Sequence, residues 1–246
     1  MDDALYHEMF QLEERYWWFV AKHNILMNLI NRFLKPSSQY VPRVCDIGCG
    51  CGALLKRLTD KYQAIGIDAS PLARAFCQQR GLEVQEGELP DAIPLESNSL
   101  DAVVLSDVLE HIEDDRAAVA AVTRMLRPGG LLLCTVPAHQ WLWSKRDEFH
   151  HHYRRYGYWQ YKRLFQSLSL TTEILSFYNV ATFPAMIIMR LATKFFGEKH
   201  AGPDIPVVSV PINTLLTCIF EAEKIFLPIM TFPVGASLIS VHRQNC

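Results

Sequence analysis

The stretch Val44–Gly52, with the sequence VCDIGCGCG, decides the fold of this chain. It predicts a strand over residues 42–47 that carries Asp46 near its end, then a turn with glycine at alternate positions, then a helix over residues 53–60. Glycine lets the backbone turn sharply and approach a ligand without an intervening Cβ. The helix that follows offers unpaired N–H groups at its N-terminus. The stretch therefore predicts a ligand-binding loop at the end of a strand.

A second acidic residue stands at a characteristic distance from this loop. Residues 63–68 predict another strand, and it ends in Asp68, 22 positions after Asp46. An acidic residue at about this distance is where a nucleotide-type ligand presents its ribose hydroxyls. The loop and Asp68 together predict an adenosine-containing cofactor.

Two cofactors fit these residues. Gly48, Gly50 and Ala53 satisfy the G-x-G-x-x-G/A pattern, which favours NAD and a pyrophosphate at the helix N-terminus. S-adenosylmethionine (SAM) carries no phosphate; it has a sulfonium cation and an ammonium group, which the carboxylate of Asp46 suits. On these residues alone both cofactors stay open.

The whole chain limits the class of protein. Its 246 residues are 50% hydrophobic and 20% charged, which predicts a globular domain with a substantial core. The net charge of −2 does not favour nucleic acid as a partner. The N-terminus lacks a signal-peptide layout and no apolar run reaches membrane-spanning length, so we expect a cytoplasmic protein. Seven cysteines without a Cys-x-x-Cys pair predict reduced thiols and no metal site.

Strands and helices alternate through the first half of the chain. Further strands are predicted over 83–85, 100–105 and 131–136, helices over 71–79 and 114–126, and a turn over 127–130. This rhythm predicts an α/β fold with a parallel, doubly wound sheet and helices on both faces. Ligands bind such sheets outside the carboxyl ends of the strands. A helix is also predicted over 4–34, before the first strand.

These segments resemble the successive motifs of the class I SAM-dependent methyltransferases. The resemblance covers about residues 44–137 and rests on five motifs in order, at 46–52, 66–70, 100–104, 107–112 and 126–131. The segments ERYWWF at 14–19 and DEFHHHYRRY at 147–156 resemble a bacterial and archaeal subgroup with a YWWF…RRY signature. The resemblance to that subgroup does not identify a substrate.

The resemblance implies a Rossmann-like, seven-stranded, mostly parallel sheet whose last pair is antiparallel, with strands six and seven at 171–177 and 237–242. It divides the chain into three parts. Residues 1–40 are expected to form an N-terminal helical lid, and residues 41–178 with 234–246 the SAM-binding domain. Residues 179–233 are expected to form an apolar helical insertion before the last strand.

The resemblance also implies which residues bind SAM, and the product S-adenosylhomocysteine. Their expected roles run from the methionine part to the adenine: a bed for the methionine at Gly48, Gly50 and Gly52; a contact to its ammonium group at Asp46; the ribose hydroxyls at Asp68; the adenine at Ala69, Glu88 and Leu89; and the strand-four side at Ser106, Asp107, Val108 and His111. Apart from the resemblance, the adjacent aromatic residues 16–19 predict a lid over the sulfonium, with Trp18 as the expected contact.

The acceptor side carries candidate catalytic residues. If the acceptor is a hydroxyl or an ammonium group, a base must take its proton. We consider His111, His150 and Tyr156 for this role, and expect no metal ion there. His111 has a second interpretation, in which it stabilises the cofactor cleft or caps the helix that follows.

The function predicted from these residues is SAM-dependent transfer of a methyl group to an oxygen or nitrogen atom of a small-molecule acceptor (EC 2.1.1.-). The basic residues around 145–163 favour an acidic or sugar-linked acceptor, unless they form a solvated face. The apolar insertion either packs on the domain or on a second copy in a homodimer, or it contacts a lipid-like acceptor or a membrane surface. The alternatives are a non-catalytic SAM-binding or membrane-peripheral module, and an NAD-dependent oxidoreductase.

Overall fold

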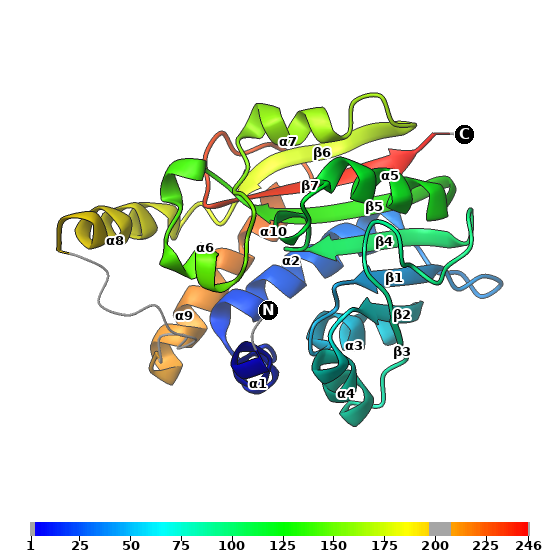
Figure 1. Ribbon diagram of the computed structural model, residues 1–246, viewed down its shortest axis with the longest axis horizontal. Helices are drawn as coiled ribbons and strands as arrows, with labels where there is room; N and C mark the ends of the chain where they lie inside the picture. The colour runs from blue at the N-terminus through cyan, green and yellow to red at the C-terminus, as the bar shows by residue number, and fades with distance from the viewer. Residues whose placement is uncertain (1–2, 197–207, 246) are drawn as a thin grey trace.

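A mixed seven-stranded sheet forms the centre of the molecule (Figure 1). The computed structural model describes residues 3–196 and 208–245, so residues 1–2, 197–207 and 246 of the expected lid, insertion and domain lie outside the described residues. In space the strands follow the order β3-β2-β1-β4-β5-β7-β6. Their bounds are β1 Arg43–Ile47, β2 Gln63–Asp68, β3 Val84–Glu86, β4 Leu100–Ser106, β5 Leu126–Pro137, β6 Leu170–Tyr178 and β7 Ser237–Gln244.

The pairing of the strands confirms the predicted Rossmann-like topology. β1 pairs in parallel with both β2 and β4, while β7 runs antiparallel to β5 and β6. The prediction of a turn at 127–130 is wrong, because these residues belong to β5, which begins at Leu126. The register between β4 and β5 shifts there, between Leu100 and Ala102, and Gly129 adopts a φ of 81°. A sequence of Arg-Pro-Gly-Gly therefore marks an irregular start of a strand here.

Helices cover both faces of the sheet. α5 and α7 pack on one face with the side chains of Val103, Leu105 and Leu132, and α2 and α3 pack on the other with Val44, Ala102 and Val104. The helices are α1 Asp3–Leu12, α2 Trp17–Phe33, α3 Ala53–Thr59, α4 Pro71–Gln79, α5 Asp115–Met125, α6 Lys145–Phe149, α7 Tyr158–Leu164, α8 Phe183–Phe196, α9 Val210–Glu221 and α10 Glu223–Phe226, with short 3-10 turns η1 Leu109–His111 and η2 Gln140–Leu142.

The N-terminal segment is two helices instead of the single predicted one. The chain leaves α1 at Leu12 and starts α2 at Trp17. Between them the carboxylate of Glu13, 4% exposed, pairs with the buried guanidinium of Arg80 next to α4. Ile25 and Leu29 of α2 are fully buried against the sheet. Only α1 and the aromatic start of α2 thus occupy the position expected of a lid, and the rest of α2 belongs to the core.

The segment after β6 forms α8, α9 and α10, with α8 pointing away from the sheet at the left of Figure 1. Its connection to the sheet depends on Glu223, whose carboxylate accepts hydrogen bonds of 2.7 Å from the backbone N–H groups of Asn179 and Val180. Phe220 and Leu227 bury their side chains against α2 and the sheet. Among the described residues no helix combines the length and apolar character needed to cross a membrane.

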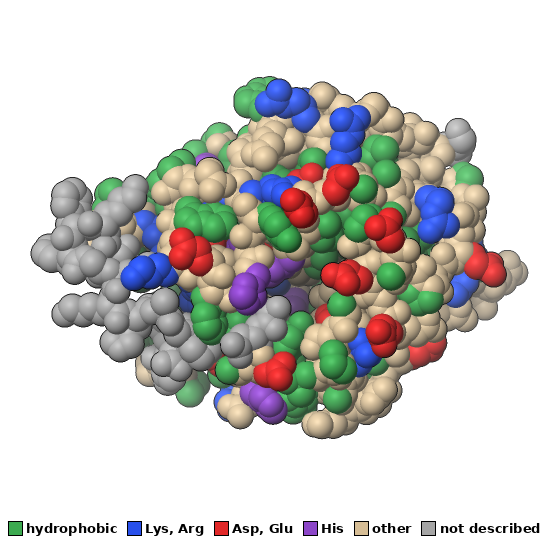
Figure 2. All heavy atoms as spheres, viewed as in Figure 1, with side chains coloured by type: hydrophobic (Ala, Val, Ile, Leu, Met, Phe, Trp, Pro, Cys, Tyr) green, Lys and Arg blue, Asp and Glu red, His purple; other side chains and the backbone are tan. Residues whose placement is uncertain are grey.

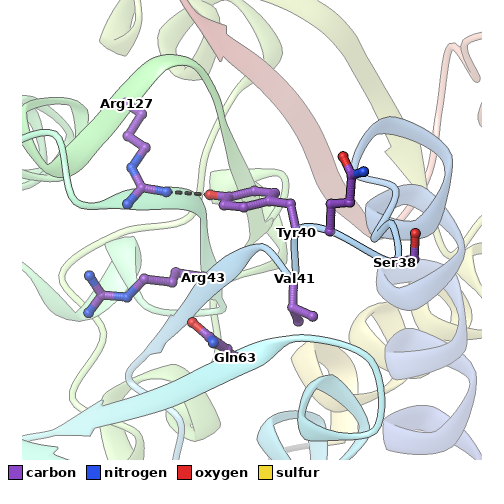
Figure 3. A pocket seen from close by; sticks show the side chains of 7 residues that line it. Ser38, Tyr40, Val41, Arg43, Gln63 and Arg127 are labelled. Carbon is purple, nitrogen blue, oxygen red and sulfur yellow. Dashed lines mark hydrogen bonds between the residues drawn. The ribbon is translucent and has the colours of Figure 1, made fainter.

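A small hollow of about 470 Å³ lies at the amino ends of the strands. Figure 3 shows Tyr40 and Arg127 pointing toward one another across it, joined by a hydrogen bond. Both side chains also bond to Asp101, so the polar groups of this hollow are paired within the protein. Because ligands of such sheets bind at the carboxyl ends of the strands, we do not assign the cofactor to this hollow.

Candidate active site

A cleft of about 1760 Å³ opens at the carboxyl ends of the parallel strands. Residues of the glycine loop and of the ends of β2 and β4 line one end of it, and residues of α8 and α9 line the other. Side chains from α1 and α2 lie along its wall. On the face shown in Figure 2, histidine, acidic and apolar side chains gather around a hollow. The cleft lies where a doubly wound sheet is expected to bind its ligand.

The glycine loop forms a cradle that a side chain would fill. Gly48 and Gly50 have positive φ angles of 71° and 55°. A Cβ on Gly48 would lie 2.6 Å from Val108, and one on Gly50 would lie 2.5 Å from Met9. Gly52 is crowded in the same way, since its φ is 89° and a Cβ there would lie 2.7 Å from Leu82. Gly48 and Gly50 line the cleft, while Gly52 supports the loop from behind.

Asp46 lies beneath this cradle with unused hydrogen-bonding capacity. It is 1% exposed, and its Oδ1 atom has no hydrogen-bond partner among the described residues. Burial raises the pKa of Asp46 to about 8, and the ammonium group of Lys22 opposes the rise. A buried, unpartnered carboxyl oxygen in a cleft is unfavourable unless a ligand satisfies it. The ammonium group of SAM has the charge and the donors to do so.

Asp68 is held rigidly at the end of β2. Its carboxylate accepts hydrogen bonds of 2.9 Å from the N–H groups of Gly50 and Ser70. Burial raises the pKa of Asp68, and these two hydrogen bonds act against the rise. One carboxylate thus joins the glycine loop to the start of α4 and still lines the cleft. Ala69, Glu88 and Leu89 also line the cleft, and their contacts to the adenine stay a prediction.

The end of β4 supplies the next part of the wall. Ser106, Asp107 and Val108 all line the cleft, and Ser106 Oγ is buried without a partner. Asp107 has a positive φ of 58°. Its carboxylate accepts hydrogen bonds from Thr135 Oγ1 at 3.0 Å and from the ammonium group of Lys22 at 2.7 Å.

Lys22 is a residue of the site that the sequence did not reveal. It projects from α2, and its side chain is only 6% exposed. Its Nζ atom lies 4.2 Å from the ring centroid of Trp18, one helical turn earlier. The ammonium group offsets the buried negative charge of Asp107 and acts on Asp46 as well. The signal in the sequence was a lysine four positions after a tryptophan, at the start of a mainly apolar helix.

Two of the three candidate catalytic residues face the cleft. His111 and His150 line it, together with His152. Burial lowers the pKa of His111 to about 3 and that of His150 to about 4, with His152 adding to both effects. Both imidazoles are therefore neutral at pH 7. Since a general base works best with a pKa near the working pH, the protein environment does not tune either histidine for that role.

Tyr156, the third candidate, lies outside the cleft, so its proposed catalytic role is wrong. The side chain is completely buried, and its hydroxyl donates to Asp115 Oδ2 at 2.8 Å and to the carbonyl of Leu109 at 3.1 Å. Its ring packs between the sheet and α5 and α7. Tyr156 therefore fixes η1, the turn that carries His111, from behind.

The basic residues of the 145–163 segment are largely committed to the fold. Arg154 pairs with Asp115 at 2.7 Å, and Arg155 pairs with Asp147 at 2.7 Å. Asp147 is 1% exposed, and its hydrogen bonds to His152 and Arg155 hold the pKa of its carboxyl below the ordinary value against the effect of burial. These two arginines thus hold the segment in place and do not support an acidic acceptor.

The comparisons with known proteins agree with this geometry. Residues 45–134 match the family model described as "Methyltransferase domain". A Ubiquinone biosynthesis O-methyltransferase of Dinoroseobacter shibae is 32% identical over 99 residues, 38% of this chain and 40% of the relative. The chain thus matches less than half the length of this curated relative.

Two solved structures share the fold. One is a chain in the complex of the Haloferax volcanii Trm112 methyltransferase activator with a methyltransferase; it has a TM-score of 0.59 and 18% identity, over 99% of this chain and 96% of that one. The other is a geranyl diphosphate methyltransferase in complex with SAM, with a TM-score of 0.58 and 12% identity, over 90% of this chain and 85% of that one. These findings and the strand order show the fold of the class I methyltransferases. Residues 45–134 match a methyltransferase domain, and SAM is the cofactor that this class of domain uses.

Proton release tests the predicted contact between Asp46 and the ammonium group of SAM. In the free protein at pH 7 the buried Asp46 carries a proton, because its pKa lies near 8. A cation bound beside it favours the carboxylate, so SAM binding should release close to one proton. Calorimetry in buffers of different ionisation enthalpy measures this number. Asp46→Asn should abolish the release and Asp60→Asn, at an exposed position, should keep it; an equal release in both variants would contradict the contact.

Replacement of Lys22 tests its part in the site. Lys22→Met leaves the carboxylate of Asp107 without its buried counter-charge, so we expect the free energy of unfolding to fall by about 3 kcal/mol. Lys56→Met is the matched control, because Lys56 pairs with Glu14 on the surface and should change stability by less than about 1 kcal/mol. Urea denaturation of both variants measures the difference. Equal effects would show that Lys22 has no such role.

Proposed function

We propose that this chain is a SAM-dependent methyltransferase whose acceptor is a small, lipid-like molecule with an oxygen or nitrogen atom to be methylated. The observation that carries the proposal is the two-ended cleft. One end has the glycine cradle with Asp46 and Asp68, and the other end is lined by apolar side chains of α8 and α9.

The residues at the first end suit SAM better than NAD. Asp46, buried under the glycine loop with an oxygen that has no partner among the described residues, can accept from an ammonium group and offers no positive charge to a pyrophosphate. Asp68, already fixed by two backbone N–H groups, presents its carboxylate to the ribose hydroxyls. When bound, SAM supplies a methyl group on a positively charged sulfur and leaves as S-adenosylhomocysteine. An oxidoreductase that uses NAD is therefore not favoured.

The cleft's contribution to the reaction is mainly to orient the reactants and exclude water. Trp18, with Lys22 beside its ring, and the side chains of α1 close the cofactor end from the side of the helices. His111 and His150 face the acceptor from the side of β4 and α6. Since burial keeps both imidazoles neutral, we assign them contacts to the acceptor and no strong proton-abstracting role.

The apolar end of the cleft supports the lipid-like acceptor. Met186 and Met189 of α8 and Leu216 and Ile219 of α9 line it. The apolar surface continues outside the cleft, where the exposed side chains are Ile188, Leu191, Val210, Ile212, Leu215, Ile225 and Ile229. An exposed apolar surface of this kind is typical of contacts with apolar ligands, membranes or other proteins. Peripheral membrane contact and a homodimer through this surface stay predictions.

Oxygen is the acceptor atom that the relatives favour, because several of the curated relatives are named O-methyltransferases. Those relatives match only 38% of this chain, so this choice is part of the proposal. A non-catalytic SAM-binding module would share the cofactor end, and it is distinguished by the absence of turnover.

Transfer of labelled methyl groups tests the function. The purified protein is incubated with methyl-labelled SAM and, separately, with the lipid and the aqueous fractions of a cell extract. We expect label to enter the lipid fraction. Asp68→Ala should reduce the rate at least tenfold because the ribose loses its anchor, and Asp60→Ala should match the unchanged protein.

Two results would contradict parts of this proposal. Label in the aqueous fraction alone would show that the acceptor is polar. Label in neither fraction, with SAM binding intact, would favour the non-catalytic module.

A further inference from the structure

Three metal-ligating side chains converge on the wall of the cleft. A carboxylate oxygen of Glu110, a ring nitrogen of His111 and a ring nitrogen of His152 all lie within 4.8 Å of one another. The rings of His111 and His152 meet edge to face, with their centroids 4.6 Å apart. Glu110 and His111 stand on η1 directly after β4, while His152 follows α6, so the fold and not the sequence brings them together.

Glu110 is a second and independent indication of a ligand. It is 1% exposed, and within the part of the chain that the structure describes its Oε2 atom has no hydrogen-bond partner. The nearby ammonium group of Lys22 donates to Asp107. A buried carboxylate oxygen without a donor is costly, and a bound cation removes that cost.

The residues behind His152 orient its ring. His152 Nδ1 lies 3.1 Å from Asp147 Oδ1, which leaves Nε2 as its other ring nitrogen. Asp147 is itself fixed by Arg155 Nε at 2.7 Å and by the N–H group of Ser144 at 2.9 Å. A carboxylate bonded to the far nitrogen of a histidine is the usual support of a metal-binding imidazole, because it sets the tautomer and the ring orientation.

We propose that Glu110, His111 and His152 bind one divalent transition-metal ion of the zinc type on the wall of the cleft. Two imidazoles favour such an ion over Mg²⁺ or Ca²⁺, which prefer oxygen ligands. Three protein ligands leave a coordination position open, as in catalytic zinc sites. Ligand atoms around a tetrahedral zinc lie about 3.3 Å apart, so the side chains must close in by up to about 1.5 Å.

This site differs from the sequence-based expectation, which included no metal. Cysteine spacing suggested none, and the separation of 41 positions between His111 and His152 concealed the cluster. If the proposed function holds, the open coordination position faces the acceptor. This assignment of the open position rests on the proposed function. The metal site itself can be tested without any acceptor.

Metal binding to untagged protein is the direct test. The protein is stripped with a chelator and titrated with Zn²⁺ and with Co²⁺, whose visible absorption bands report nitrogen and oxygen ligands. We expect one ion per chain by metal analysis, with Glu110→Gln and His152→Ala each weakening binding at least tenfold. His7→Ala, at an exposed position on α1, is the matched control and should bind as the unchanged protein does.

A third variant tests the orienting role of Asp147. Asp147→Asn should weaken metal binding about 10–100-fold, as loss of a carboxylate behind a ligand histidine does. Thermal unfolding of each variant without metal shows whether it is folded, and only folded variants are compared. The double variant His111→Asn/His152→Asn replaces Glu110→Gln if the latter does not fold.

Two outcomes would overturn the metal site. One is the absence of Co²⁺ bands and of bound Zn²⁺ at millimolar metal, and the other is unchanged binding in the folded ligand variants. Calorimetry with SAM on the same sample separates this inference from the proposed function. SAM binding without metal binding would reject the metal site alone, and metal binding without SAM binding would reject the proposed function alone.

Discussion

The architecture of the site depends on carboxyl groups that are buried at the carboxyl edge of the sheet. Asp46, Asp68 and Glu110 are each less than 8% exposed, and they stand at or just after the ends of β1, β2 and β4. Water cannot stabilise such carboxyl groups, so hydrogen bonds, cations or protons must do so. Asp68 is satisfied by backbone N–H groups, whereas Asp46 and Glu110 each keep an oxygen without a partner. The unsatisfied oxygens mark the places where the cleft is prepared for positively charged groups.

Two segments outside the glycine loop complete this charged edge. Lys22 reaches it from α2, and this helix is positioned by apolar side chains such as Ile25 that are buried against the sheet. The segment after β5 brings His152 and Asp147 to the opposite wall, fixed by ion pairs of Arg154 and Arg155. The packing of an ordinary core thus determines where the functional charges lie, and α8 and α9 add an apolar end to a polar cleft.

Local sequence predicted the parts of the site that depend on local geometry. The segment 44–52 fixes a strand, a turn and a helix start within nine residues, so spacing alone indicates its structure. The break between α1 and α2 at residues 13–16 contains no proline or glycine, so the local sequence did not predict it. At this break Glu13 forms a tertiary ion pair with Arg80 next to α4. Tyr156 lies in an aromatic, basic motif whose pattern does not distinguish burial from exposure. Lys22 pairs with Asp107, 85 positions away, and His152 contacts His111, 41 positions away. The spacing of residues along the chain carries no information on such distant pairs.

The central claim is that the cleft binds SAM, and direct titration of the unchanged protein tests it most directly. SAM, S-adenosylhomocysteine and NADH are compared by calorimetry under one set of conditions. The account predicts binding of the first two with one molecule per chain and no heat from NADH. Binding of NADH alone would contradict it, and would make the glycine loop a pyrophosphate site with Asp46 in a purely structural role.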